Sequence, residues 1–313
     1  MKAKFRKYAG AEDFLRVRDF LAETFHAFVE PTNWGIERWN WARYHPMVFC
    51  EKDQALTASH IAFWEGAVGL WEDGAGRIVG VVNAEMPEPA GEAFLQRVPE
   101  ADGLLPEMLE YAESRLADPA TGRLQVSTVF DHDEALRSLL RARGYEPDPE
   151  PMDCRAEYDM AAIPEPRLPA GYAILAMSEG GDRAERCRVQ GLGFNHPDPA
   201  VWMTVAEYAE VRKAPDYRED LDLVVCAPSG EYAACCILWH DARNKVCFFE
   251  PVCTRPEYRR LGLGRELLYE AMRRGRELGA ARAYVGSRQE FYRNIGFRMR
   301  LFSRGWSRPG GGA

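Results

Sequence analysis

The carboxylate of Glu250 is followed, within one short segment, by the pair Arg259-Arg260 and two glycines: EPVCTRPEYRRLGLG, at positions 250–264. Glu250 lies near the end of an apolar, strand-like run, and RRLGLG leads directly into an amphipathic, helical run. A helix N-terminus presents unpaired backbone N–H groups and the positive end of the helix dipole, and both favour phosphate. The segment therefore predicts a phosphate-binding turn beside a carboxylate. A plain strand-to-helix turn is the alternative interpretation, because glycine is common in turns.

A second segment, FYRNIGF at positions 291–297, places a tyrosine after the next strand-like run, ARAYVG. Together the two segments resemble the GNAT superfamily of acetyl-CoA-dependent N-acetyltransferases. The family signature, Gln/Arg-x-x-Gly-x-Gly/Ala, stands here as Arg259-Arg260-Leu261-Gly262-Leu263-Gly264, and its aromatic-Tyr-x-x-x-Gly-Phe segment stands at 291–297. Both motifs occur in the family's order. The resemblance implies that backbone N–H groups of residues 259–264 hold the pyrophosphate of coenzyme A.

The resemblance also implies where the rest of the cofactor lies. In the superfamily the pantetheine arm enters a gap beside the fourth strand, which corresponds here to the cofactor-binding residues Val252, Cys253 and Thr254. Pro251 cannot donate to a strand ladder, which favours such a gap. Many members carry an Asn several residues before the tyrosine. Val285 stands in its place, so this contact is either missing here or supplied by Ser287.

Two residues are the predicted catalytic groups, Glu250 and Tyr292. A lysine-like amine must lose a proton before it attacks a thioester, which costs about 4.6 kcal/mol at pH 7. Family members often use a carboxylate on the fourth strand as the base, and Glu250 lies two residues further on, on the same face of a strand. A structural salt bridge to an arginine is the other interpretation of Glu250. Tyr292 is expected to donate a hydrogen bond to the leaving thiolate, since a phenol is a weaker acid than a thiol.

Other side chains are open alternatives for these roles. Cys253 would suit a covalent route, although a cysteine in a strand more often packs as a small hydrophobe. His196 and His240 are alternative bases. Three aromatic residues are candidates for an acceptor pocket or for ordinary core packing, namely Trp202, Tyr208 and Trp239.

The elements that position these residues occur twice along the chain. Residues 106–145 and 265–297 both read as amphipathic helix, small-residue turn, apolar strand, second helix and a Gly-aromatic pair. The copies differ at the loop: the second has RPEYRRLGLGREL where the first has VPEADGLLPEML. The first copy lacks the arginines, keeps Gly103 and places Pro106, which has no N–H, near the helix start. We expect the first copy to have lost the ability to bind the cofactor.

The repeat predicts two tandem α/β domains. Residues 1–160 form the degenerate GNAT-like copy, the proline-rich segment 161–171 is a linker, and residues 172–313 form the acetyl-CoA-binding copy. As the resemblance implies, each domain should be a mixed, mostly antiparallel sheet flanked by helices. An acceptor cleft is expected between the two domains.

Composition narrows the partners. The chain has 313 residues and a formal net charge of -8, so a nucleic acid is not an expected partner. The sequence predicts no signal peptide, membrane span or metal site, and most of its eight cysteines fall in apolar strand-like runs, which favours a reduced, cytoplasmic protein.

The expected activity is direct transfer of acetyl from acetyl-CoA to a primary amine, on a small molecule or a protein. A non-catalytic CoA-binding sensor or interaction module, or a transferase for another acyl-CoA, are the alternatives. The acceptor and the oligomeric state are left open.

Overall fold

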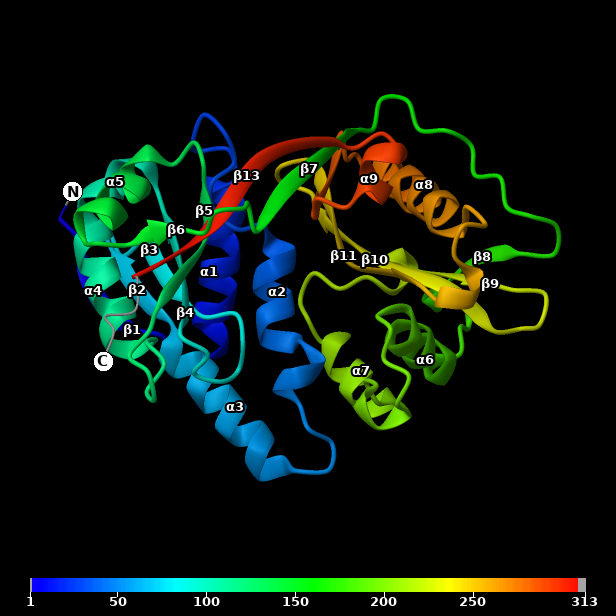
Figure 1. Ribbon diagram of the computed structural model, residues 1–313, viewed down its shortest axis with the longest axis horizontal. Helices are drawn as coiled ribbons and strands as arrows, with labels where there is room; N and C mark the ends of the chain where they lie inside the picture. The colour runs from blue at the N-terminus through cyan, green and yellow to red at the C-terminus, as the bar shows by residue number, and fades with distance from the viewer. Residues whose placement is uncertain (1, 309–313) are drawn as a thin grey trace.

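Two groups of strands and helices with the same order make up the computed structural model, which describes residues 2–308 (Figure 1). The strands of the first half are β1 (Lys4–Lys7), β2 (Gly69–Glu72), β3 (Ile78–Asn83), β4 (Glu92–Arg97), β5 (Gln125–Phe130), β6 (Glu146–Pro147) and β7 (Asp153–Asp159). Its helices are α1 (Ala11–Thr24), α2 (Ile36–Tyr44), α3 (Gln54–Ala67), α4 (Leu105–Arg115) and α5 (Glu134–Ala142).

The second half repeats this order with two helices instead of three between its first two strands and with no counterpart of β6. Its strands are β8 (Ala173–Ala176), β9 (Asp222–Cys226), β10 (Tyr232–Asp241), β11 (Val246–Thr254), β12 (Arg282–Gly286) and β13 (Arg298–Ser307). Its helices are α6 (Arg183–Gly193), α7 (Val205–Val211), α8 (Leu263–Glu277) and α9 (Glu290–Asn294). In each half an antiparallel meander ends in one parallel pair, β4 with β5 and β11 with β12. The predicted fold class, two mixed and mostly antiparallel sheets flanked by helices, is confirmed.

The two sheets join through their last strands. The strand order is β1-β2-β3-β4-β5-β13-β7-β12-β11-β10-β9-β8. The first half's β7 therefore pairs with β12 of the second half, and the second half's β13 pairs with β5 of the first. β7 and β13 also pair with each other and cross between the halves in Figure 1. Each half thus supplies a strand to the sheet of the other.

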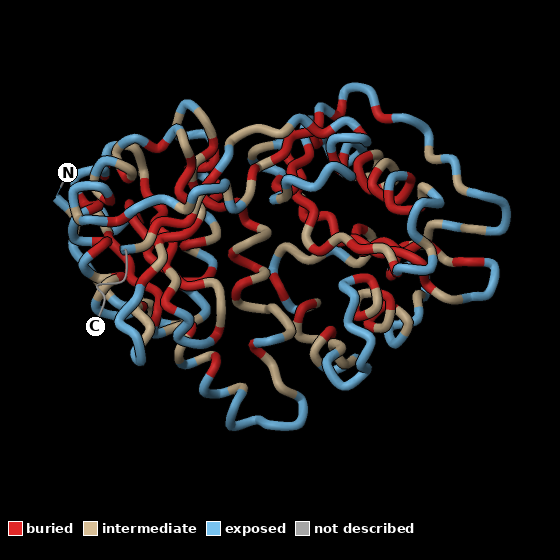
Figure 2. The backbone as a smooth tube through the Cα atoms, viewed as in Figure 1, coloured by how far each residue is buried: buried red, intermediate tan, exposed pale blue. Residues whose placement is uncertain are grey.

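The core of the second half explains why its central strands are so apolar. Nine of the ten residues of β10 are buried, because α8 covers one face of the sheet and α6 lies over the other. The buried face of α8 carries Leu267, Leu268 and Met272, which pack on this sheet. The buried backbone follows the strands of both halves in Figure 2, while the linker after β7 is mostly exposed. Within residues 2–308, no helix is both long enough and apolar enough to cross a bilayer.

Candidate functional site

The glycine-rich turn forms an open helix start. Helix α8 begins at Leu263, and its N-cap residue, Gly262, has φ of 80°, in the left-handed region that favours glycine. Arg260 has φ of 67°. No side chain caps the helix at Gly262, so the first N–H groups of α8 have no partner within the helix. Positive potential from the helix dipole adds to these donors, and the turn has the chemistry of an anion site.

The two sequence motifs meet in space at Gly264. A Cβ atom at this position would lie 3.0 Å from Oγ1 of Thr254 and 3.2 Å from the ring of Phe291. The start of α8 therefore touches both the end of β11 and the start of α9. The close approach needs a residue without a side chain, which explains the second glycine of the turn.

A wedge opens between β11 and β12 beside this turn. Their parallel pairing includes Val246, Cys247 and Phe248 of β11 and goes no further. Beyond it, Val252, Cys253 and Thr254 pair with β10 alone. The edge of β11 that faces β12 is therefore unpaired along these residues, and an extended ligand can pair with it as an added strand.

The Cys253 side chain packs in the protein core. Its Sγ atom lies 3.3 Å from Sγ of Cys235 on β10, in the buried layer under α6. The neighbouring thiol and burial raise the pKa of Cys253 well above its usual value, which disfavours the reactive thiolate. This geometry favours packing over the covalent route.

The two arginines of the turn differ in their surroundings. The Arg259 guanidinium donates to the carbonyls of Thr254 and Gly193 at 3.0 and 2.9 Å and to Oδ1 of Asn195 at 2.7 Å. It thereby ties the turn to the end of α6. Arg260 and Leu261 are exposed on the turn. Ser287, just after β12, accepts a hydrogen bond from the Gln289 N–H through its Oγ atom.

Tyr292 lies on α9 and is 5% exposed. Its ring packs against Phe291 and Phe297, with centroid distances of 5.0 and 5.7 Å. Burial, and then the charge of Glu250, raise the pKa of Tyr292 well above its usual value. The hydroxyl therefore stays protonated and can donate a hydrogen bond.

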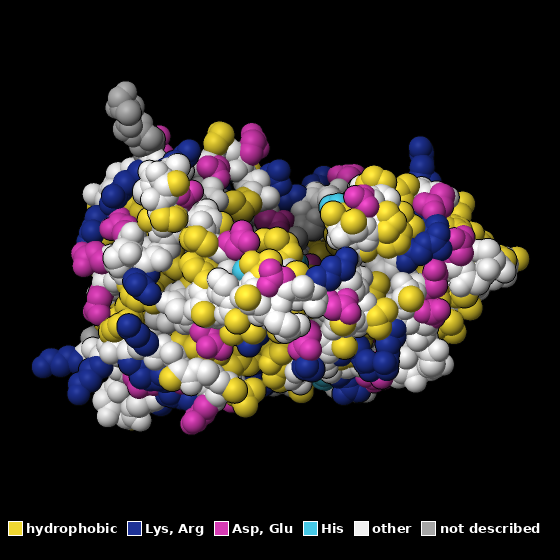
Figure 3. Space-filling view, turned by 90° about the horizontal axis from the view of Figure 1, so that it is seen from below, with side chains coloured by type: hydrophobic (Ala, Val, Ile, Leu, Met, Phe, Trp, Pro, Cys, Tyr) yellow, Lys and Arg dark blue, Asp and Glu magenta, His cyan; other side chains and the backbone are white. Residues whose placement is uncertain are grey.

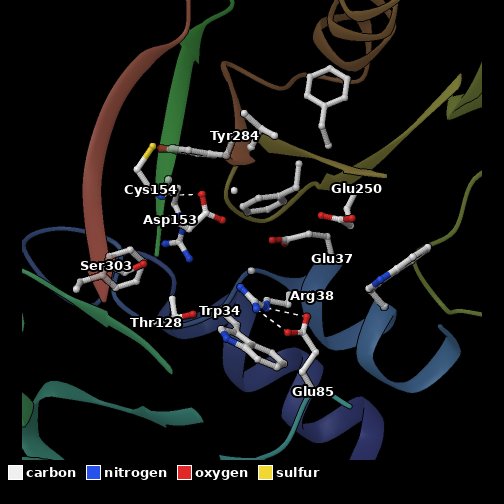
Figure 4. A pocket seen from close by; sticks show the side chains of 18 residues that line it. Trp34, Glu37, Arg38, Glu85, Thr128, Asp153, Cys154, Glu250, Tyr284 and Ser303 are labelled. Atoms are coloured by element: carbon white, nitrogen blue, oxygen red, sulfur yellow. Dashed lines mark hydrogen bonds and ion pairs between the residues drawn. The ribbon is translucent and has the colours of Figure 1, made fainter. Parts of the chain in front are cut away.

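Glu250 lines a cavity of about 200 Å³ that lies between the two halves (Figure 4). Burial raises the pKa of Glu250 to about 7; the charge of Arg38 opposes this shift, and the nearby carboxylate groups add to it. No ion pair joins Glu250 to an arginine among residues 2–308. The salt-bridge interpretation of this residue is therefore not supported, and a carboxylate with this pKa is suited to accept a proton at neutral pH.

Most of the cavity wall comes from residues that sequence reasoning missed. The first half contributes Trp34, Glu37, Arg38 and Trp41 from α2 and the residues before it. Gly35 allows this approach, because a Cβ atom there would lie 2.7 Å from the ring of Phe248 on β11. The exchanged strand β7 adds Asp153 to Arg155. The tryptophan-rich stretch NWGIERWNW was the available signal, but nothing in it indicates which strand it contacts.

The alternative candidates lie outside this cavity. Tyr208 is buried, and its hydroxyl donates to Asp222 at 2.7 Å. Trp202 donates to the His196 carbonyl on an exposed loop at 2.7 Å. His240 lies at the far end of β10 from the wedge, opposite Cys247. Trp239 comes nearest, because its Nε1 atom donates to the Glu250 carbonyl at 2.7 Å, but it does not line the cavity.

The equivalent wedge of the first half is filled by its own chain. β4 and β5 pair only at Glu92 and Ala93, and the segment before α2 occupies the space beyond. The Asn33 side chain accepts from the Arg97 N–H at 3.0 Å and donates to the Arg97 carbonyl at 2.8 Å. The Arg97 guanidinium forms a buried ion pair with Asp133, 2.8 Å apart. The remaining space is only about 10 Å³, and Pro106 lies in the first turn of α4.

Comparison with protein families also distinguishes the second half from the first. Residues 184–297 match the model of the Acetyltransferase (GNAT) family. The matched range runs from α6 to the end of the Tyr292 motif, and it contains the turn, the wedge and Glu250. No curated protein matches the chain by sequence.

Solved structures resemble the chain over its full length. A tandem GNAT protein from the clavulanic acid biosynthesis pathway is 15% identical with a TM-score of 0.63, and all of both chains is covered. A GCN5-related N-acetyltransferase from Sphaerobacter thermophilus is 17% identical with a TM-score of 0.60, covering 98% of this chain and 96% of that one. A Drosophila protein is 12% identical with a TM-score of 0.54, covering 99% and 100%. At these identities the likeness establishes the fold alone.

Proposed function

We propose that this chain, a member of the GNAT acetyltransferase family with the fold of a tandem GNAT protein, transfers an acetyl group from acetyl-CoA to a primary amine. The observation that carries the proposal is the position of Glu250. This carboxylate faces a cavity, and the unpaired edge of β11 and the open start of α8 follow it along the chain.

The features of the second half fit acetyl-CoA. The free N–H groups at the start of α8 and in the turn at residues 260–264 would hold its pyrophosphate. The unpaired edge of β11 at Val252–Thr254 would pair with the amides of its pantetheine arm, and Ser287, just after β12, would supply a further contact. When bound, acetyl-CoA supplies the thioester carbonyl that an amine attacks.

Glu250 and Tyr292 would move and hold the protons. Glu250 accepts the proton that the amine nitrogen loses as the new C–N bond forms. The Val252 N–H would face the carbonyl oxygen, on which negative charge develops. As the C–S bond breaks, the sulfur takes the bonding electrons, and the Tyr292 hydroxyl donates a hydrogen bond to it.

The first measurement is calorimetric titration of acetyl-CoA into the intact chain, with matched glycine variants. Gly262→Val puts a β-branched side chain at φ of 80° in the turn, whereas Gly103→Val changes the equivalent turn of the first half, where a Cβ atom has open space. We expect one site per chain, lost in Gly262→Val and kept in Gly103→Val. A panel of primary amines then tests turnover.

The outcomes separate the alternatives. Two sites per chain would contradict the filled wedge of the first half. No binding would contradict the enzyme assignment. Binding without turnover of any amine would indicate a non-catalytic CoA-binding protein, and turnover only with longer acyl-CoA donors would indicate a different acyltransferase.

A further inference from the structure

We propose that the acceptor is a small amine that carries a second positive charge, and that Glu37 of the first half binds this charge while Glu250 faces the reacting amine. The inference rests on the proposed function, since it names the substrate class of the same site. It follows from the balance of charged groups in the cavity and from the side chains that already have partners.

The two cations that line the cavity already donate hydrogen bonds, and one of them forms an ion pair. Arg38 donates to both oxygens of Glu85, at 3.0 and 2.6 Å. Arg155 donates to the backbone carbonyls of Pro31 and Asn33, at 3.2 and 2.9 Å. The charge of Arg38 is therefore balanced by Glu85, whereas Arg155 is held by neutral carbonyls. Four carboxylates and two guanidinium groups line the cavity, so an anionic tail on the acceptor would add to an excess of negative charge.

The carboxylates, in contrast, exceed the cations. Glu37, Asp153 and Glu250 line the cavity together with the paired Glu85. Glu37 Oε2 is buried without a hydrogen-bond partner. Asp153 accepts one hydrogen bond, from the Cys154 N–H at 2.8 Å. In Figure 4 the Glu37 and Glu250 side chains point into the same space from opposite walls. A buried carboxylate oxygen without a partner, such as Glu37 Oε2, is costly, and a cationic ligand offsets that cost.

The carboxylates of the cavity do not continue into an acidic patch on the face that Figure 3 shows. On the face in Figure 3, acidic and basic side chains are interspersed. Among residues 2–308, no three His, Cys, Asp or Glu side chains converge in a way that could hold a metal ion. The arrangement therefore suits an organic cation, whose charge is spread over separate amino groups.

The size and the apolar wall of the cavity limit that cation further. Its volume of about 200 Å³ is below the roughly 300–1,000 Å³ of pockets for drug-sized ligands. Trp34, Trp41, Phe248 and Tyr284 supply apolar walls for a methylene chain, and aromatic faces attract ammonium groups. A short α,ω-diamine matches all these features, whereas a branched oligosaccharide amine is too large.

Three probes of equal length test the inference: 1,4-diaminobutane, 1-aminobutane and 4-aminobutanoate. They share the reacting amine and differ only in the charge of the other end, which is positive, neutral or negative. With the intact chain and acetyl-CoA, we expect kcat/KM to be highest for the diamine and lowest for the amino acid. Charged hydrogen bonds of this kind correspond to about a ten- to hundredfold preference over the neutral probe. Homologues of three to six carbons identify the best length.

Glu37→Gln removes the charge and keeps the shape of the side chain. It should shrink the preference for the diamine over 1-aminobutane by about tenfold or more, mainly through KM. Glu146→Gln, an exposed position on β6, is the matched control and should leave the preference unchanged. A purely structural effect of Glu37→Gln would lower the activity with both probes in proportion and keep their ratio.

The outcomes distinguish this inference from the proposed function. Turnover of other amines with no preference for a second positive charge, at any chain length, would overturn the inference and leave the function standing. A preference for the diamine that Glu37→Gln does not change would remove Glu37 from its role and so contradict the proposal. No turnover of any amine would contradict the proposed function itself.

Discussion

Glu37 and Glu250 line one cavity from the two halves of the molecule, and burial raises the pKa of each to about 7. An ordinary glutamate is ionised throughout the neutral range, whereas these two titrate within it. Arg155 and Arg38 lower the pKa of Glu37, but not enough to offset burial. At the residue scale, protons and a cationic ligand therefore compete for the carboxylates of Glu37 and Glu250.

This titration predicts a pH dependence of activity. Glu250 accepts a proton only when it is ionised, so kcat/KM should rise with pH through an apparent pKa of about 7 and then level off. The apparent value belongs to the interacting carboxylates together. The check is a pH–rate profile at saturating acetyl-CoA, and a profile that is flat from pH 5.5 to 8.5 would exclude a base of this pKa.

Replacement of the base is the companion prediction. Glu250→Gln should lower kcat by about a hundredfold or more, because general-base catalysis is lost, while calorimetry shows unchanged affinity for acetyl-CoA. Glu146→Gln again serves as the control. Turnover equal to that of the unaltered chain would remove Glu250 from the mechanism.

Glu37 also carries a prediction about stability. Its folded pKa, about 7, is above the ordinary value of 4.5, so the contribution of Glu37 to stability is complete below pH 4.5 and declines as pH rises through 7. Glu37→Gln should therefore stabilise the chain at pH 8, by about 1–3 kcal/mol, and have little effect at pH 4.5. Thermal melts at both values measure this. A melting temperature lowered at pH 8 would contradict the prediction.

At the scale of elements, the wedge between a parallel pair of strands is open in one half and filled in the other. Asn33 meets the backbone of Arg97 through both its amide oxygen and its amide nitrogen. A pantetheine amide offers a strand edge the same donor and acceptor. In the first half, the Asn33 side chain therefore pairs with backbone groups whose counterparts on β11 have no partner.

Removal of this side chain should destabilise the chain without opening a site. Asn33→Ala leaves the buried N–H and carbonyl of Arg97 without partners, at a cost of about 2 kcal/mol or more. Thr32→Ala, one residue away, should change stability by less than about 0.5 kcal/mol. Denaturant unfolding gives both values. Acetyl-CoA titration of Asn33→Ala should still give one site, because α4 has Pro106 in its first turn and the turn before it has no arginine.

Features that depend on neighbours in the chain were predictable from the sequence. The strand–turn–helix at 246–277, the second motif on α9 and the repeat of elements all follow from local patterns of apolar residues and glycine. Features that depend on packing between distant segments were not. The sequence is equally consistent with an Arg259 side chain that contacts phosphate, whereas in the structure this side chain bonds to Gly193 and Asn195. Glu37 had no chemical signal at all, because its role depends on a strand more than 200 residues away.

At the scale of the whole molecule, the halves are joined by the exchange of β7 and β13 and by side-chain contacts. Arg18 and Asn40 both bind Asp216 of the second half, with distances down to 2.5 and 2.7 Å. Asn244 donates to the Ala22 carbonyl at 2.8 Å. The cavity lies in this junction, so its shape depends on the junction staying intact.

A cut in the linker should therefore leave the molecule whole. A protease site inserted at the exposed Ala170 lies between β7 and β8, outside every exchanged strand. After cleavage, both pieces should elute together in size-exclusion chromatography and keep acetyl-CoA binding. In concentrated guanidinium they should separate, which verifies the cut. Separation in native buffer would mean that the strand exchange does not hold the halves together.

The exchange of strands has a consequence for how such a gene can change over generations. A copy whose cofactor wedge has filled would ordinarily be free to decay or to be deleted. Here its deletion would remove β7 from beside β12 and strip one wall from the Glu250 cavity. Mutation can therefore change residues of the first half, but loss of the whole first half would also disrupt the second.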